Sequence, residues 1–536
     1  MTSQTQHIAA TSKGCNTNEH KRWNRRSFLQ ALGLVGGGTI ALANSAVSVA
    51  KPSPLSAAIS AADNDRIMIL IRLKGGNDGL NTIIPLYDYD TYANARPTIR
   101  IKQNELFKLN DDFGMATYAS QLEKLWKDGQ MKVVHGVGYE DSSLSHFDGS
   151  DIWATTDVDN EIRSGWMGRY FQELYPDYLT NPPEKPTAIQ IGNNGNLIFN
   201  AQDNNYAFAV ADPKKLYEIA KNGELYDLND LPDCTYGEKV GYLKGVANTT
   251  FAYAGVINEA FEKSRDFGGY PENKLANQLS IIARLIKGNL GTKVYMVELS
   301  GFDTHDDQRN RQQELISDLA DTVAHFYKDL NSAGWDENVL AMTLSEFGRR
   351  VAENGSAGTD HGTASQTLLF GPALEGNGFI GAHPDLSDLD RIGNLKPNTD
   401  FRQLYATLLK EWMCVNPSLV DEVLLGQDFE AISIGFGCNT LATTDVSVSV
   451  STFRHVITYE GDRTFLNLTA DTTSHIDIAL YNILGQKVAT LKNELLLEGD
   501  HKIDIKTEAK TFLDTGQYVY RISTGRQTFS NQLIIM

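Results

Sequence analysis

Cysteine is scarce in this chain of 536 residues, which contains four. No two of them form a C-x-x-C pair, and three of them, Cys234, Cys414 and Cys438, lie beyond the first 50 residues. So sparse a set excludes a zinc knuckle and a dense disulfide framework. Cys414 and Cys438 could form a disulfide in an oxidising compartment or remain buried thiols, and the sequence leaves both open.

Positive charge is also in short supply. The chain has 48 lysines and arginines against 67 aspartates and glutamates, a formal net charge of −19, and no basic run occurs beyond the first 30 residues. Nucleic-acid binding needs a basic surface to meet the phosphates, so we expect no nucleic-acid partner. The acidic surface indicates solubility and little more.

Long hydrophobic runs are missing as well. The apolar run 31–43 is short and rich in glycine and alanine, so it does not predict a membrane anchor. It follows the basic stretch 21–29, in which Arg25-Arg26 precedes Ser27-Phe28-Leu29. This arrangement resembles the twin-arginine export signal. The resemblance implies a signal peptide over residues 1–50, a linker over 51–65, export of the folded protein by the twin-arginine machinery, and a mature chain without a transmembrane segment.

Short apolar runs are abundant instead, and each predicts a strand that is buried on both faces. Helical patterns such as 278–286 and 315–323 lie between these runs. Strands that alternate with helices predict an α/β domain over residues 66–438, with a mostly parallel sheet covered by helices on both faces. Active sites of such sheets lie at the carboxyl ends of the strands. The predicted strands are 66–73, 131–137, 294–299, 339–344 and 366–370.

The pattern changes near residue 440, where apolar and polar residues begin to alternate. Glycines that are typical of turns separate the alternating stretches, which predicts a small β-sandwich over residues 439–536. The segments 478–488 and 513–522 are similar to the C-terminal sorting domain of type IX secretion substrates. The resemblance implies delivery through the periplasm to the cell surface or the medium by the type IX machinery. An ordinary carbohydrate-binding or adhesive sandwich is the alternative.

Polar residues follow the first two predicted strands. Asp78 lies in the glycine-rich turn 74–82, where its carboxylate could bind a hard metal ion or simply belong to an Asn-Asp-Gly turn. Ser145 and His146 lie in the segment 138–153, at the predicted start of a helix. The free N–H groups of a helix start favour Ser145 as a nucleophile, although a serine there can also cap the helix. His146 could be a general base or a group that supports the ligands from behind.

Two candidate metal ligands follow the strand 294–299. Asp303 and His305 are separated by one residue, so both side chains point to one side in an extended segment, as two ligands of one ion would. A surface turn with scattered acids is the alternative.

The last polar residues follow the strand 339–344. Glu346 is a candidate carboxylate ligand, and Arg349 could contact a substrate oxyanion or pair with the nearby acids. His361 is a candidate ligand in the next loop. Asp360 beside it is a further candidate ligand, or the group that orients the ring of His361.

In this order the motifs resemble those of metal-dependent hydrolases and mutases of the alkaline phosphatase and sulfatase superfamily. More closely, the chain from residue 66 to about residue 425 is similar to the bacterial domain-of-unknown-function family DUF1501, whose members carry twin-arginine signals. The resemblance implies an alkaline-phosphatase-like fold. The motifs that carry it are GGNDGLNT, SHFDGSDIW, GFDTH, SEFGRR and GTDHG.

The resemblance also implies two divalent metal ions, which could be Mn, Mg, Ca or Zn. The second of the two implied ligand sets contains only oxygen, which suits Mn²⁺, Mg²⁺ or Ca²⁺ better than Zn²⁺. His383 could replace His361 as a ligand. The first set is Asp303, His305 and His361, and the second is Asp78, Glu346 and Ser145.

The activity that the resemblance implies is hydrolysis of a phosphate or sulfate ester of a small molecule or glycan. Ser145 would be the nucleophile, with Thr82 as the alternative. The chain departs from the superfamily at Glu346-Phe347, which stands where the superfamily has Asp-His, so one site would lose an imidazole. A non-catalytic cell-surface binding protein that retains the hydrolase fold is therefore the alternative function.

Overall fold

The computed structural model describes residues 65–438 and 453–535 with short gaps. The predicted signal peptide, nearly all of the predicted linker, Cys234 and the start of the predicted sandwich lie outside the described residues. The chain divides near residue 440 into two compact units, and each is described by itself. The gaps are 177, 179–181, 193–194, 202–203, 222, 224–225, 228–230, 232–234, 373–377, 437, 461–462, 471–473, 483–486, 514 and 525–527.

The first unit contains a sheet of nine strands: β1 (Ile67–Lys74), β5 (Met131–Gly138), β6 (Ala188–Ile191), β7 (Ala207–Val210), β8 (Val294–Ser300), β9 (Val339–Leu344), β12 (Ser365–Phe370), β13 (Phe379–Ile380) and β14 (Thr399–Asp400). Their order is β13-β5-β12-β9-β1-β8-β6-β7, with β14 also paired to β5. Strand β12 runs antiparallel to β5 and β9, and the other pairings are parallel. The mostly parallel sheet predicted from the apolar runs is confirmed.

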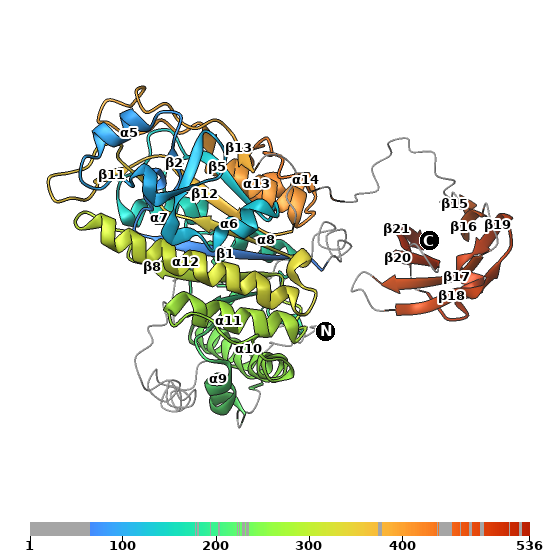
Figure 1. Ribbon diagram of the computed structural model, residues 1–536. Coiled ribbons are helices and arrows are strands. Elements are labelled where there is room, and N and C mark those ends of the chain that lie inside the picture. The colour runs from blue at the N-terminus through green and yellow to red at the C-terminus, as the bar shows by residue number, and fades with distance from the viewer. Residues whose placement is uncertain are drawn as a thin grey trace, which may run out of the picture. The chain divides into compact units, whose positions relative to one another are not determined.

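Helices cover both faces of this sheet (Figure 1). On one side, α11 buries Leu275, Leu279, Ile282 and Ile286, a spacing that places all four on one helical face. On the other side, α7 and α13 pack together through Trp153. The helices are α4 (Gly79–Thr82), α5 (Tyr89–Ala95), α6 (Leu122–Lys127), α7 (His146–Thr155), α8 (Trp166–Leu174), α9 (Pro213–Ala220), α10 (Thr235–Lys263), α11 (Lys274–Lys287), α12 (Gln308–Asn331), α13 (Phe401–Thr407) and α14 (Pro417–Val423).

Two small sheets complete the first unit. One joins β2 (Ile84–Pro85), β4 (Phe113–Ala116) and β3 (Leu106–Lys108), and the other pairs β10 (Gly348–Arg349) with β11 (His361–Gly362). In the sheet of β10 and β11, Arg349 lies opposite His361. This ribbon fixes the position of two predicted site residues relative to each other.

The structure pairs Cys414 with Cys438 in a disulfide, which decides between the two states that the sequence left open. The bond closes a loop between two segments that are 24 residues apart in the chain. A search of the described residues finds no helix with the length and hydrophobicity needed to cross a bilayer.

The second unit is a β-sandwich, as the alternating pattern predicts. Leu466, Ile478, Leu480 and Ile522 point into its apolar core. One sheet has the order β15-β16-β19 and the other β18-β17-β20-β21, both antiparallel. The elements are β15 (Phe453–Glu460), β16 (Arg463–Ala470), β17 (Ser474–Asn482), β18 (Lys487–Leu496), β19 (Gly499–Asp504), α15 (Ile505–Ala509), β20 (Gly516–Thr524) and β21 (Thr528–Ile535).

Candidate metal centre

The predicted site residues gather at one edge of the large sheet. Strands β1, β5, β8 and β9 run in the same direction, so the loops that follow them leave at the same edge. Asp303 follows β8, Glu346 follows β9, and His146 opens α7 after β5. Because β12 is antiparallel, it begins at this edge, and His361 therefore joins the group from the segment before β12.

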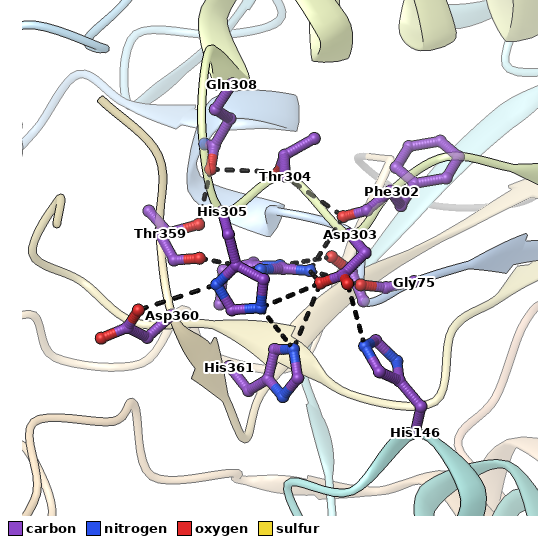
Figure 2. A network of polar contacts seen from close by, with 12 residues as sticks. Gly75, His146, Phe302, Asp303, Thr304, His305, Gln308, Thr359, Asp360 and His361 are labelled. Carbon is purple, nitrogen blue, oxygen red and sulfur yellow. Dashed lines mark hydrogen bonds and ion pairs between the residues drawn. The ribbon is translucent and has the colours of Figure 1, made fainter. Parts of the chain in front are cut away.

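Three of these side chains converge on a common point. His146, Asp303 and His361 each offer one ligand atom, and these atoms lie within 4.8 Å of one another. Asp303 Oδ1 is 3.2 Å from His361 Nε2, and Asp303 Oδ2 is 3.3 Å from His146 Nε2 (Figure 2). Two imidazole nitrogens and a carboxylate are a ligand set that transition-metal ions such as Zn²⁺ accept.

The ring of His361 is held in the form that binds metals. Its Nδ1 lies 2.7 Å from the carbonyl oxygen of Leu144, which can only accept, so Nδ1 carries the proton and Nε2 keeps its lone pair. Burial lowers the pKa of His361 despite this hydrogen bond, which favours the neutral ring. Its Nε2 is 2.9 Å from Nε2 of His305. Two ring nitrogens facing each other and a carboxylate fit a shared cation.

His305 lies at the border of this group. Its Nε2 is 3.1 Å from Asp303 Oδ1, and its Nδ1 is 3.7 Å from Asp360 Oδ1. The side chain of His305 is 45% exposed. Asp360 therefore faces His305 rather than His361, whose ring is oriented by the Leu144 carbonyl (Figure 2).

Glu346 supports His146 from behind. Its Oε1 accepts a hydrogen bond from the Gly75 amide at 2.8 Å and lies 3.1 Å from His146 Nδ1. This contact places the His146 proton on Nδ1 and leaves Nε2 free to coordinate, as carboxylate partners of metal-binding histidines do. The Glu346 side chain is 2% exposed, and its Oε2 has no hydrogen-bond partner within the described part of the chain. A buried, half-satisfied carboxylate fits a neighbouring cation.

Phe347 occupies the place where the superfamily resemblance calls for an imidazole. It is 1% exposed, and its ring centre lies 4.5 Å from that of His361 and 5.0 Å from that of His146. Glycines make room for this packing: a Cβ on Gly76, whose φ is +82°, would lie 2.4 Å from the Phe347 ring. A Cβ on Gly149 would lie 3.1 Å from the Glu346 carbonyl oxygen. Phe347 thus holds two candidate ligands in place without coordinating.

Arg349 is fully buried and ties the loops together. Its guanidinium donates to the carbonyl oxygens of Gly76 at 2.9 Å and Thr359 at 2.8 Å, and to Asp303 Oδ1 at 2.7 Å. It therefore orients Asp303 and does not face a substrate. Burial opposes ionisation of Asp303, but the hydrogen bond and the positive charge of Arg349 outweigh it and lower the pKa of this carboxyl to about 2.

The structure does not bring Asp78 into this group. Its Oδ2 pairs with the buried Arg96 at 2.6 Å and also accepts from Gln308, while its Oδ1 caps α4 through the Leu80 and Asn81 amides. The second implied ligand set of Asp78, Glu346 and Ser145 is therefore not assembled. Among the described residues the search for clustered ligands finds one group, that of His146.

The remaining predicted residues lie in three different places. Ser145 is the N-cap of α7, is half-buried, and accepts from the Asp148 amide at 3.4 Å. Thr82 is 1% exposed, and its hydroxyl donates to the Asp78 carbonyl at 2.8 Å. His383 lies in a separate aromatic cluster, where its Nδ1 is 2.9 Å from the Pro384 carbonyl and its Nε2 is 3.2 Å from Gln366.

Sequence reasoning missed two features of this site. It assigned His146 as a general base or as a group that supports the ligands, and not as a ligand, although the glutamate at the end of a parallel strand, Glu346, was a signal for a carboxylate–histidine pair. It also gave no role to Arg96, which is 18 residues from Asp78 in the chain and pairs with it in the core. No local pattern marks that pairing.

Two family models match the chain. One is described as a protein of unknown function (DUF1501) and matches residues 132–430, and the other is described as a secretion system C-terminal sorting domain and matches residues 462–536. Both matches agree with the resemblances found in the sequence. The sorting domain, of the type IX kind, indicates a secreted or cell-surface protein. No curated protein matches the chain.

Several solved structures similar to the chain are named as sulfatases, alkaline phosphatases or members of the alkaline phosphatase superfamily. A lipoteichoic acid synthase from Listeria monocytogenes is 11% identical, with 83% of this chain and 90% of that chain covered and a TM-score of 0.27. A sulfatase from a Pseudoalteromonas species is 10% identical, with 87% and 90% covered and a TM-score of 0.30. An alkaline phosphatase superfamily protein from Vibrio parahaemolyticus is 9% identical, with 76% and 77% covered and a TM-score of 0.26. Similarity this low assigns no chemistry.

Proposed function

We propose that this chain, which belongs to the DUF1501 family of proteins of unknown function, is an exported, metal-dependent hydrolase of phosphate or sulfate esters. The observation that carries the proposal is the convergence of His146 Nε2, Asp303 and His361 Nε2 within 4.8 Å. They meet at the carboxyl edge of a parallel sheet and at the first turn of α7, where α/β enzymes bind anionic substrates.

Neighbouring residues hold the three candidate ligands in position to bind a cation. Glu346 holds His146, the Leu144 carbonyl holds His361, and Arg349 holds Asp303, so the three ligand atoms are fixed before any ion arrives. Of the four ions that the sequence suggested, two imidazoles favour Zn²⁺ over Mn²⁺, Ca²⁺ and Mg²⁺. When bound, a divalent ion supplies charge that polarises the ester and lowers the pKa of a nearby hydroxyl.

Ser145 is the proposed nucleophile. It precedes His146 directly and caps α7, whose free N–H groups stabilise negative charge. Its Oγ would lose its proton to water and displace the alcohol from phosphorus or sulfur. A water molecule would then hydrolyse the phosphorylated or sulfated serine, which releases phosphate or sulfate and restores the hydroxyl. Thr82 is less suited, because its hydroxyl is buried and already donates to a backbone carbonyl.

The proposed route of export combines both ends of the chain. A twin-arginine signal would take the folded protein to the periplasm, and the sorting domain over residues 462–536 would direct it to the type IX machinery. The substrate would then be an ester of a small molecule or glycan outside the cell.

One observation favours the non-catalytic alternative. Arg349, a candidate for holding a substrate oxyanion, donates to four carbonyl oxygens and to Asp303, so its guanidinium is not offered to a ligand. A cell-surface protein that binds a glycan or a partner would keep the same framework without turnover.

The test combines metal analysis with assays on 4-nitrophenyl phosphate and 4-nitrophenyl sulfate in the presence of Zn²⁺, Mn²⁺, Mg²⁺ or Ca²⁺. Wild type should contain a metal ion and hydrolyse one of the two esters. His361→Ala should lose the ion, and Ser145→Ala should keep the ion but lose turnover. His383→Ala is the matched control, because this histidine lies outside the group.

Two results would count against the proposal. Bound metal without Ser145-dependent turnover would favour the binding protein. A wild-type protein that holds none of the four ions would remove the metal centre itself.

A further inference from the structure

We infer that Phe147 contacts the alcohol part of the substrate and selects esters of alcohols that carry a ring. This inference rests on the proposed ester hydrolysis at the same site. The Phe147 side chain is 85% exposed, although it lies in the first turn of α7 directly after His146. An exposed phenylalanine beside a candidate metal ligand leaves its ring available to contact an apolar face of a ligand.

The geometry of a helix places the Phe147 ring at the rim of the metal centre. Successive helical residues point about 100° apart, because 3.6 residues complete a turn. Since His146 points at Asp303, with 3.3 Å between Nε2 and Oδ2, helical geometry directs the Phe147 side chain to one side of the ion group and not into it. That is where the alcohol would extend from an ester bound between these ligands.

The backbone of the same turn suits the charged part of the ester. Ser145 engages two amides of α7, those of Asp148 through its side chain and Gly149 through its carbonyl. The amides of His146 and Phe147 precede the first intrahelical hydrogen bonds and stay at the open end of the helix. Phe147 can therefore donate its amide to the ester anion while its ring lies beside the alcohol.

A second observation indicates a ligand at this helix end. The Glu346 side chain, 2% exposed, contacts His146 through Oε1, and its Oε2 has no partner within the described part of the chain. A buried carboxylate oxygen without a donor next to the first residue of α7 points to a missing positive group. The helix end is thus part of a built site and not merely a free terminus.

The ring of the alcohol could be aromatic or a sugar, since both present an apolar face to a phenylalanine. The next residue, Asp148, is exposed, and its carboxylate accepts from Ser143 at 3.4 Å and from Asn160 at 3.3 Å. A carboxylate beside an aromatic ring can accept hydrogen bonds from sugar hydroxyls. The shared chemistry is a six-membered ring that stacks on Phe147.

The experiment compares three classes of ester on the full-length, metal-loaded protein: 4-nitrophenyl, sugar (galactose 6-sulfate and glucose 6-phosphate) and methyl. For the ring esters, Phe147→Ala should raise KM about tenfold with kcat little changed, since one stacking contact contributes roughly 1 kcal/mol or more. Methyl esters should be unaffected, and Phe147→Trp should restore the wild-type KM. Phe512→Ala is the matched control, because Phe512 is 87% exposed and lies in the other unit.

Calorimetric titration with phenyl sulfate and galactose 6-sulfate separates this inference from the proposed hydrolysis. Phe147-dependent binding without turnover would overturn the hydrolase and support the ring contact. Turnover of ring esters that is unchanged in Phe147→Ala, or reduced equally for methyl esters, would overturn the ring contact and leave the hydrolase standing. Absence of both turnover and Phe147-dependent binding would overturn both. The sugar and phenyl arms show which ring the site prefers.

Discussion

Two neighbouring strands of the sheet, β1 and β8, are each followed by a glycine-containing loop with an aspartate that pairs with a buried arginine. Asp78 after β1 is 1% exposed and lies 2.6 Å from Arg96. Asp303 after β8 is 46% exposed and lies 2.7 Å from Arg349. The two residues look alike in the sequence, yet the structure gives them opposite surroundings.

The two carboxylates differ in the other groups that contact their oxygen atoms. Both oxygens of Asp78 are taken up by donors, which are two backbone amides on one side and Arg96 with Gln308 on the other. The oxygens of Asp303 face ring nitrogens of His146, His305 and His361, which can bind a cation. A carboxylate surrounded by donors supports the fold, whereas one surrounded by imidazoles can hold a metal.

The largest expected effect is on stability, at Asp78. Asp78→Asn removes the carboxylate that pairs with Arg96 and leaves a buried guanidinium uncompensated, so we expect a loss of roughly 3–5 kcal/mol in the free energy of unfolding. Guanidinium unfolding of the metal-free protein measures it. The protein that remains folded should bind metal as wild type does.

The control for Asp78→Asn replaces both partners. Asp78→Leu with Arg96→Met should cost less than either single change, because no buried charge is then left alone. An Asp78→Asn protein that is as stable as wild type but holds no metal would break the comparison, since Asp78 would then act as a ligand.

Much of the fold could be predicted because its signals are local. The apolar runs 294–299 and 339–344 fall within β8 and β9, and the helical pattern 278–286 falls within α11. Alternation over residues 464–468 likewise marks β16. A strand that is buried on both faces leaves a continuous apolar run in the sequence. A helix that is buried along one stripe, and a strand that is buried at alternate residues, each leave apolar residues at a regular spacing, so each pattern identifies its element.

The roles of the acidic residues could not be predicted in the same way. Arg349 is 46 residues from Asp303 in the chain, and the Leu144 carbonyl is 217 residues from the ring that it orients. Partners this far apart in the chain have no fixed sequence spacing from which their contact could be predicted. The helix-capping role of Asp78 could have been predicted, since an aspartate before Gly-Leu-Asn at the end of a strand is also typical of a helix start.

A smaller effect, on metal affinity, is expected at Glu346, which tests whether a carboxylate beside an imidazole supports a metal centre. Glu346→Gln keeps the shape of the side chain but removes the charge behind His146, so metal affinity should fall about 10–100-fold, as for other carboxylate partners of metal-binding histidines. Competition with a chelator measures the affinity. Glu353→Gln is the matched control, because Glu353 accepts from the Thr98 and Ile99 amides. Equal affinities in wild type and Glu346→Gln would remove Glu346 from the metal centre.

The smallest effect on stability is expected when Asp303, the second aspartate of the comparison, is replaced by asparagine. In metal-free protein, Asp303→Asn should change the free energy of unfolding by less than about 1 kcal/mol, because the carboxylate is half-exposed and solvent screens its pairing with Arg349. The amide oxygen of asparagine can still accept from Arg349, whose other bonds go to carbonyl oxygens. Added Zn²⁺ at one hundred times the dissociation constant should stabilise wild type by about 2.7 kcal/mol and Asp303→Asn far less. If Asp303→Asn instead destabilised the metal-free protein as much as Asp78→Asn, both aspartates would support the fold, and the contrast between the two loops would disappear.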